Sequence, residues 1–470
     1  MDSSKQKTIT FNSSLWILMP VTTGMLLTIY IFYPGYMSPD SIDQLTQARQ
    51  GLFTDWHPPM MSWLWGCFDR IIPGPLGMLV FHNLLFWSGV GLLVPLIVPH
   101  WSNALKCIVI ITVGMFPPIF MLLSTIWKDV GMAGAFLFGS AWIFYAEKKQ
   151  SLIAFVLGII AIGYGMALRH NAIIATIPLG MYASKTLYNL LSMDFKRHQS
   201  VAIGVMGFVL LGLMLGSIKT IEKRLTHGST IYPIQQIFVH DLTALSIDLD
   251  TVLLPDYLLQ PQLPTIEDLK KIYTPDTIVP LFCCDRTTFR LQMTQLPKDI
   301  SDLFNQWGKT ILAHPLLYLT HRMRVFSRQF GIVGKRVCYP YHYGIDNNSL
   351  GLLYKERPLT RVVFAAIKPV DNFLFRGWIY IVISTAMLTY ISLRKKRDYP
   401  LVVTAINFSG WFYGMAYFFI ATTCDFRMHY WTVVATVVSV VSSISIIKKS
   451  NVRRKSSDLT LTHSISSYLT

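Results

Sequence analysis

Three side chains that can exchange protons lie close together after the first apolar stretch of the chain. They are the carboxylates of Asp40 and Asp55 and the imidazole of His57. Partial burial beside an apolar surface can raise the pKa of a carboxylate towards neutrality, so such a group suits removal of a proton from a hydroxyl. Acidic and histidine side chains also suit a divalent metal. Their spacing does not decide between the two.

A short helix is expected to carry Asp40. Ser38 is a suitable N-cap, Pro39 suits the first helical position, and Gly51 suits the end. Asp40 then lies in the first turn, where a lone carboxylate often does no more than complement the helix dipole. The nearness of Asp55 and His57 favours the chemical role.

Cationic residues occur at the ends of other apolar stretches, at Lys128, Arg169 and Arg427. A lipid-linked phosphate needs such cations at the edge of an apolar groove, because its chain stays in hydrocarbon while its head is paired by Lys or Arg. The alternative is interhelical salt bridges, such as Arg169 with Asp129 or Asp425. Adjacent polar residues would support the site: Asp129, His170, Asn171 and Asp425.

The elements that must position these residues are membrane helices. Of the 470 residues, 52% are hydrophobic and only 14% are charged, which predicts a polytopic α-helical membrane protein. The net charge of +16 could indicate nucleic acid, but the basic residues form short clusters between apolar runs, which membrane topology explains better. About ten stretches have spanning length: residues 15–33, 76–99, 104–123, 127–145, 151–168, 171–191, 200–218, 377–393, 400–420 and 429–447.

With ten spans, the basic clusters all fall on one side, which the positive-inside rule makes cytoplasmic. These clusters are Lys5/Lys7, Lys148/Lys149, Lys196/Arg197, Arg394 to Arg397 and Lys448 to Lys455. The predicted division is a transmembrane module at 1–218 with a catalytic external loop at 34–75, an external domain at 219–375, further transmembrane helices at 376–447, and a cytoplasmic tail at 448–470.

The external domain is predicted to be mixed, with strand-like segments around residues 255–280 and a long helix from Ile300 to Phe330. Near its end, residues 321–328 alternate cationic and apolar types, as in a helix that lies on a membrane surface. A solvated helix face is an equal alternative. A disulfide from Cys338 to Cys283 or Cys284 is possible in an oxidising compartment, although free thiols are as consistent with the sequence.

The motifs together resemble the bacterial membrane glycosyltransferases of the GT-C superfamily, and most closely the serotype-converting O-antigen glucosyltransferases. The resemblance covers most of the chain through short motifs: Ser38-Pro39-Asp40, Asp55-Trp56-His57-Pro58-Pro59, Trp127-Lys128-Asp129, Arg169-His170-Asn171, His314-Pro315 with Tyr318, and Asp425-Phe426-Arg427. It implies a polyprenyl-phosphate sugar donor, a reaction on the periplasmic face, and Asp40 as catalytic base. Ser41 stands where several subfamilies have a second acid, and such donors generally need no metal.

The resulting hypothesis is a bacterial inner-membrane enzyme that transfers a hexose, glucose by resemblance, from undecaprenyl phosphate to a lipid-linked O-antigen glycan. Asp40 is the predicted base, oriented with the acceptor by Asp55 and His57, while Lys128, Arg169 and Arg427 hold the phosphate. No metal or other cofactor and no nucleic-acid partner is expected. The rival is a transporter or flippase of lipid-linked sugars, which should carry ionisable residues near the bilayer midplane.

Overall fold

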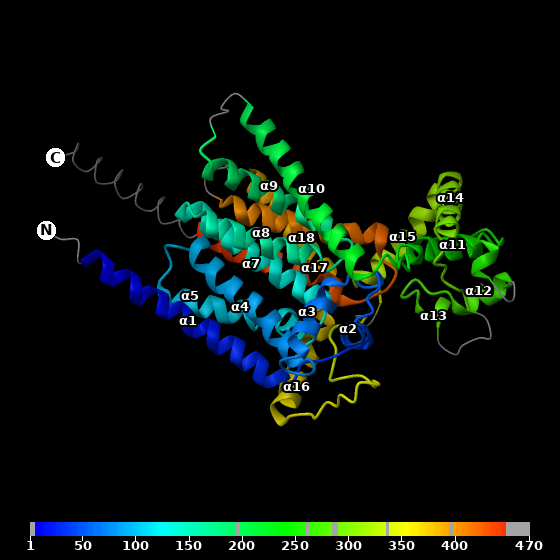
Figure 1. Ribbon diagram of the computed structural model, residues 1–470, viewed down its shortest axis with the longest axis horizontal. Helices are drawn as coiled ribbons and strands as arrows, with labels where there is room; N and C mark the ends of the chain where they lie inside the picture. The colour runs from blue at the N-terminus through cyan, green and yellow to red at the C-terminus, as the bar shows by residue number, and fades with distance from the viewer. Residues whose placement is uncertain are drawn as a thin grey trace, which may run out of the picture.

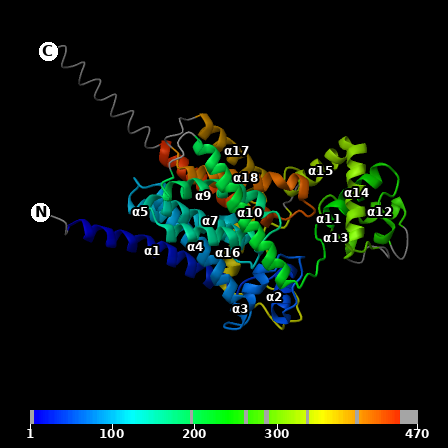
Figure 2. The same cartoon turned by 45° about the horizontal axis from the view of Figure 1, so that its top comes forward.

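The structure is a computed structural model that describes residues 5–193, 198–259, 264–283, 290–334, 338–393 and 399–447. A bundle of long helices carries at one end a lobe of shorter helices, which stands apart from it in both views (Figures 1 and 2). The bundle contains α1 (Lys5–Phe32), α4 (Leu76–Ile97), α5 (Asn103–Gly114), α6 (Pro117–Leu122), α7 (Lys128–Lys149), α8 (Leu152–Met166), α9 (Ala172–Leu190), α10 (Gln199–Leu225), α17 (Gly377–Leu393), α18 (Leu401–Ile420) and a last helix, Phe426–Ile447, whose first turn is η3 (Phe426–His429).

Each predicted apolar stretch coincides with helix, with one difference. The stretch at 104–123 is divided into α5 and α6, because two consecutive prolines start α6 at Pro117 and a proline inside a continuous helix would lack the amide for its hydrogen bond. The basic clusters at 196–197, 394–397 and 448–455, and the tail at 448–470, lie outside the described residues. The predicted orientation therefore remains a prediction.

The centre of the bundle is α7, which packs against α4 on one side and α8 on the other. Small residues allow the second contact: a Cβ added to Gly139 would lie 2.7 Å from the carbonyl oxygen of Gly158. In lipid, the hydrophobic effect does not favour contact between helices, so such close approach stabilises them through van der Waals packing. The N-terminal end of α7, which begins at Lys128, lies at the end of the bundle nearest the lobe (Figure 1).

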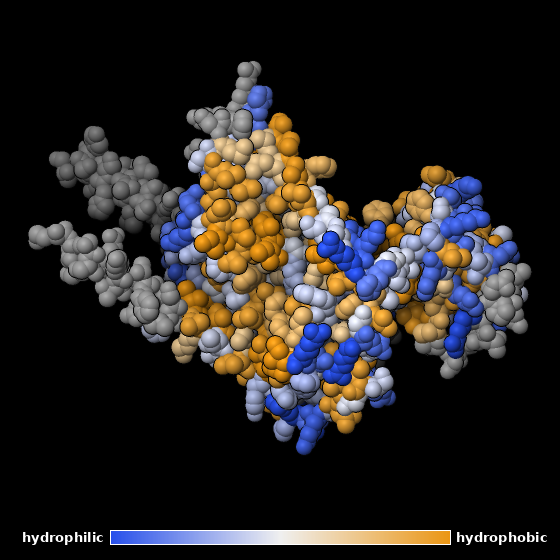
Figure 3. Space-filling model, in the orientation of Figure 1, coloured by the Kyte–Doolittle hydropathy of each residue, from blue (hydrophilic) through white to orange (hydrophobic). Residues whose placement is uncertain are grey.

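Within the described residues, four helices are long and apolar enough to cross a membrane: α4, α7, α10 and Phe426–Ile447. A fifth span is possible if the bent pair α16 (Pro358–Leu374) and α17 counts as one, and several other apolar helices are shorter. Figure 3 shows apolar side chains over the flank of α8 and α10. On α10, Phe208 is 80% exposed, as expected of a lipid-facing helix in a membrane protein. The count of ten spans remains a prediction.

The lobe is helical, and the predicted strands were wrong for the described residues. It contains α11 (Gln235–Asp248), η2 (Asp256–Leu258), α12 (Ile266–Ile272), α13 (Val279–Phe282), α14 (Pro297–Ala313) and α15 (Pro315–Gln329). Its own apolar core is built around Leu242, Leu258, Leu269 and Leu303. Short apolar runs between prolines are ambiguous between strand and helix, and here packing against α11 selects helix.

The long helix predicted at 300–330 is also two helices, because Pro315 starts α15 after a break at His314. The surface-helix interpretation of its end was wrong for His321 and Arg322, which are fully buried. Both contact the buried carboxylate of Asp241, with Arg322 Nη2 at 2.6 Å from Oδ2. Arg322 Nη1 also donates to the carbonyl oxygen of Ala421, so this buried ion pair joins the lobe to the end of α18.

Two short helices and a long loop cover the lobe end of the bundle. They are α2 (Pro39–Gln50), α3 (Met60–Asp69) and the segment that follows α15. In that segment, Gly344 accepts from the amide of Met37, and the amide of Asp346 donates to the Met37 carbonyl. The disulfide joins Cys338 to Cys424. Cys338 is therefore paired neither with Cys283 nor with Cys284, the partners that the sequence left open beside free thiols, because the fold places this segment beside the loop before the last helix.

Candidate functional site

The start of α2 has the predicted form, since Ser38 is its N-cap, Pro39 its first residue, and Gly51 ends it with a φ of 69°. Ser38 does not cap the helix with its side chain. Its hydroxyl accepts instead from the indole of Trp127 at 2.8 Å. The backbone of Tyr36 bonds to Ser124 and Ile126 in the turn before α7. These bonds fix Asp40 beside the N-terminus of α7.

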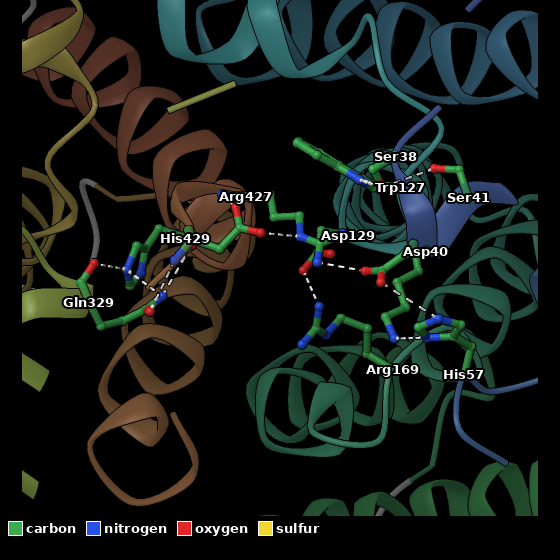
Figure 4. Close-up of polar contacts among 12 residues, drawn as sticks. Ser38, Asp40, Ser41, His57, Trp127, Asp129, Arg169, Gln329, Arg427 and His429 are labelled. Carbon is green, nitrogen blue, oxygen red and sulfur yellow. Dashed lines mark hydrogen bonds and ion pairs between the residues drawn. The ribbon is translucent and has the colours of Figure 1, made fainter. Parts of the chain in front are cut away.

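Asp40 lies between a guanidinium and an imidazole (Figure 4). Its Oδ2 is 2.6 Å from Arg427 Nη2, and its Oδ1 is 3.9 Å from His57 Nε2. The Asp40 side chain is 32% exposed, whereas those of Arg427 and His57 are 13% and 5% exposed. The carboxylate therefore stands at the accessible edge of a buried polar cluster.

His57 has its tautomer set by Lys128. The distance between Lys128 Nζ and His57 Nδ1 is 2.7 Å. With Lys128 protonated, its ammonium can only donate, so Nδ1 accepts and Nε2 carries the proton. Burial, followed by the nearby Lys128 charge, lowers the pKa of His57 well below its ordinary value. His57 is thus neutral and directs an N–H towards Asp40 and, at 3.8 Å, towards Asp43.

The expectation that burial raises the pKa of Asp40 was wrong for this state of the protein. Burial does raise it, but the charges of Arg427 and Lys128 together have the larger effect and lower the pKa below the ordinary value. Asp40 is therefore ionised and already forms an ion pair with Arg427. Asp43, one turn later, has a pKa raised by burial, although Gln47 donates to its carboxylate at 2.7 Å.

Arg427 is held on three sides. Besides Asp40, its Nε lies 2.7 Å from Asp425 Oδ2, and its guanidinium carbon is 4.8 Å from the centre of the Trp127 ring. Burial raises the pKa of Asp425 to about 6. Gln329 of α15 both donates to the Asp425 carbonyl and accepts from its amide, so the lobe's last helix helps to position this loop.

Arg169 forms the interhelical salt bridge given above as an alternative to phosphate binding. Its Nη1 is 2.5 Å from Oδ1 of Asp129, which is 1% exposed, and its Nε donates to Asn171. Asp425 pairs with Arg427 and not with Arg169. Because Asp129 is buried, removal of Arg169 would leave an uncompensated charge, so an alanine variant would test folding before it tested function.

Asp55 does not join the cluster around Asp40. Its carboxylate accepts from the backbone amides of Ile231 and Tyr232, in the segment after α10. Its carbonyl oxygen lies 2.9 Å from His170 Nε2, and burial lowers the pKa of that histidine. Asp55 and His170 therefore tie the loop at residues 34–75 to neighbouring segments.

A crevice opens beside the cluster, between the first loop and α8, α9 and α10. Its walls are mainly apolar, and its polar lining comes from Arg169, His170, Lys219 and Glu222. Pro58, the neighbour of His57, also lines it. The crevice thus lies between α10 and the residues that support the polar cluster.

Sequence reasoning missed three contributors: Asp43, Trp127 and Gln329. The position of Asp43, one turn after Asp40, could have indicated it. Trp127 belongs to the Trp127-Lys128-Asp129 motif, but the sequence indicated no role for its side chain. Gln329 carries no signal in the sequence. His314 and Tyr318, also in the quoted motifs, lie at the corner of α14 and α15, where Tyr318 packs against Leu245 of the lobe. Among the described residues, no group of three or more His, Cys, Asp and Glu is arranged to hold a metal ion.

Comparison with known proteins leaves the family open. No family model matches the sequence, and no curated protein matches it. Among solved structures, the chain is similar to the archaeal oligosaccharyltransferase AglB from Archaeoglobus fulgidus, in complex with an inhibitory peptide and a dolichol-phosphate, with 11% identity and a TM-score of 0.39. That alignment covers 94% of this chain and 52% of the other, so this chain spans about half the length of that protein. A likeness this remote carries no argument about function.

Proposed function

We propose that the protein is a membrane glycosyltransferase that takes a sugar from a polyprenyl phosphate. The observation that carries the proposal is the placement of Asp40, His57, Lys128 and Arg427 together at the bundle end, beside a mainly apolar crevice between the first loop and α8, α9 and α10. A donor with an anionic head and a long apolar chain matches both parts. The motif resemblance to the GT-C superfamily supports the same substrate class.

In this proposal Lys128 and Arg427 stabilise the phosphate as it leaves. Cations placed where negative charge develops lower the barrier for the reaction. Lys128 is the more available of the two, because its described polar contact is with neutral His57, whereas Arg427 already pairs with Asp40 and Asp425. Arg169 acts mainly through Asp129 and shapes the crevice.

The reaction that fits is a single displacement. The acceptor hydroxyl oxygen bonds to the anomeric carbon, the bond from that carbon to the phosphate oxygen breaks with its electron pair going to the phosphate, and Asp40 receives the hydroxyl proton. His57 orients Asp40 through its Nε2 hydrogen. Asp55 is proposed as a positioning residue only, because its carboxylate is held by backbone amides.

The finer proposal is that the sugar is a hexose, glucose by resemblance, that the carrier is undecaprenyl phosphate, that the acceptor is a lipid-linked O-antigen glycan, and that the site faces the periplasm of a bacterial inner membrane. Mass spectrometry of the surface glycan from cells with and without the protein tests it. An added hexose in cells with the protein is expected. An unchanged glycan with altered amounts of lipid-linked precursor on the two sides would favour the transporter alternative.

A further inference from the structure

The described cations of the site have acidic neighbours before any substrate arrives. Lys128, Arg169 and Arg427 are accompanied by Asp40, Asp129 and Asp425, and Asp43 lies nearby at 3.8 Å from His57. Arg169 is committed to the buried Asp129, and Arg427 contacts two carboxylates. A donor phosphate that needs a second cation besides Lys128 must therefore compete with a carboxylate for Arg427.

The two carboxylates on Arg427 are not equivalent. Asp425 is two residues away in the same loop, is 11% exposed, and has its backbone bonded to Gln329. Asp40 reaches Arg427 from a different helix and is 32% exposed. The exposed partner on a separate element is the one that an incoming anion can displace.

Arg427 would keep its position after losing Asp40. Asp425 and the Trp127 ring hold the guanidinium, and its Nη1 is buried without a hydrogen-bond partner among the described residues. Asp40 would also keep a polar neighbour, because His57 Nε2 lies 3.9 Å from its other carboxylate oxygen. Arg427 and Asp40 would thus each keep polar neighbours if the ion pair between them broke.

We propose that Arg427 is an exchangeable cation that pairs with Asp40 in the resting protein and transfers to the donor phosphate on binding, so that Asp40 becomes a base only after the donor is in place. This inference rests on the proposed function. In the exchange, the contact between Arg427 Nη2 and Asp40 Oδ2 breaks and one to a phosphate oxygen forms. Asp40 then loses the neighbouring positive charge that suppressed its proton affinity.

The exchange fixes an order of events. A protein without donor has no competent base, so acceptor hydroxyls and water are not activated prematurely. Direct competition between Asp40 and the phosphate also means that neutralising Asp40 should improve phosphate binding. A role for Arg427 as a mere structural partner of Asp40 predicts no such improvement.

A double-mutant cycle on lipid-phosphate binding tests the proposal. The purified full-length protein in nanodiscs is titrated with undecaprenyl phosphate that carries no sugar, with undecaprenol as the control ligand. We expect Asp40→Asn to bind the phosphate about tenfold more tightly than wild type, the scale of one competing charge-assisted contact. In an Arg427→Gln background, Asp40→Asn should change the affinity less than about twofold if its effect acts through Arg427.

Asp69→Asn provides a matched control, because Asp69 pairs with Arg49 at 2.8 Å away from the site and its loss should leave phosphate affinity unchanged. Arg427→Met, which also removes the charge but keeps a long side chain, replaces Arg427→Gln if that variant unfolds. Equal or weaker phosphate binding by Asp40→Asn, with clear binding by wild type, would overturn the exchange but leave the proposed function standing. If wild type binds undecaprenyl phosphate no better than undecaprenol, both proposals are overturned.

Discussion

Replacing Asp40 with asparagine should remove transfer while preserving the fold. The amide cannot take a proton at neutral pH, and positioned proton transfer typically contributes ~10² to 10⁴ in rate, so we expect transfer to fall at least ~10². This corresponds to a barrier increase of about 2.7 kcal/mol or more. The assay is single-turnover hexose transfer by purified protein at saturating donor.

The same substitution should lower the free energy of unfolding by less than it raises the barrier of the reaction. A charge-assisted contact is worth about 1.5 to 3 kcal/mol when buried, but the Asp40 side chain is 32% exposed, which screens its ion pair and reduces that value. Arg427 also keeps Asp425, and asparagine can still accept a hydrogen bond. We therefore expect a stability loss below about 1 kcal/mol.

Asp69→Asn is the control for this change as well, since it removes the carboxylate of an ion pair outside the site. The side chains of that pair, Arg49 and Asp69, are 31% and 13% exposed. Its activity should stay within about twofold of wild type. Asp43→Asn is not a neutral control, because Asp43 lies 3.8 Å from His57. A fully active Asp40→Asn protein would refute the assignment of the base, and Asp43 would then replace it as the candidate.

Four further results are expected. Lys128→Gln should weaken donor affinity about 10- to 100-fold with normal insertion, because it removes a charge-assisted phosphate contact; unchanged donor dependence would contradict this. Alkaline phosphatase fused after Phe330 should be active and fused after Leu393 inactive, and the reverse pattern would invert the predicted orientation. Transfer should persist in chelator, whereas loss that magnesium or manganese restores would show metal dependence. Cys424→Ser should lower thermal stability and transfer, because the disulfide joins Cys338 and Cys424 across a sequence separation of 86 and such disulfides typically contribute about 2 to 4 kcal/mol. Unchanged thermal stability and transfer would exclude a positioning role for the disulfide.

Local signals in the sequence were sufficient for the helices of the bundle and for the start of α2. Apolar runs of spanning length and the Ser-Pro start with a terminal glycine are properties of neighbouring residues, and the structure has helices at those positions. The same signals failed in the lobe. Short apolar runs around residues 255–280 fit strand or helix equally, and only packing against α11 decided between them.

The types of residue in the site were also readable, since Asp40, His57, Lys128 and Arg427 stand out as polar groups beside apolar stretches. Which of them touch was decided by the tertiary structure. Asp40 comes from α2 and Arg427 from the last helix, so no local pattern could predict that they form an ion pair. That contact is also what reverses the expected pKa shift of Asp40, because the charge of a distant residue outweighs local burial.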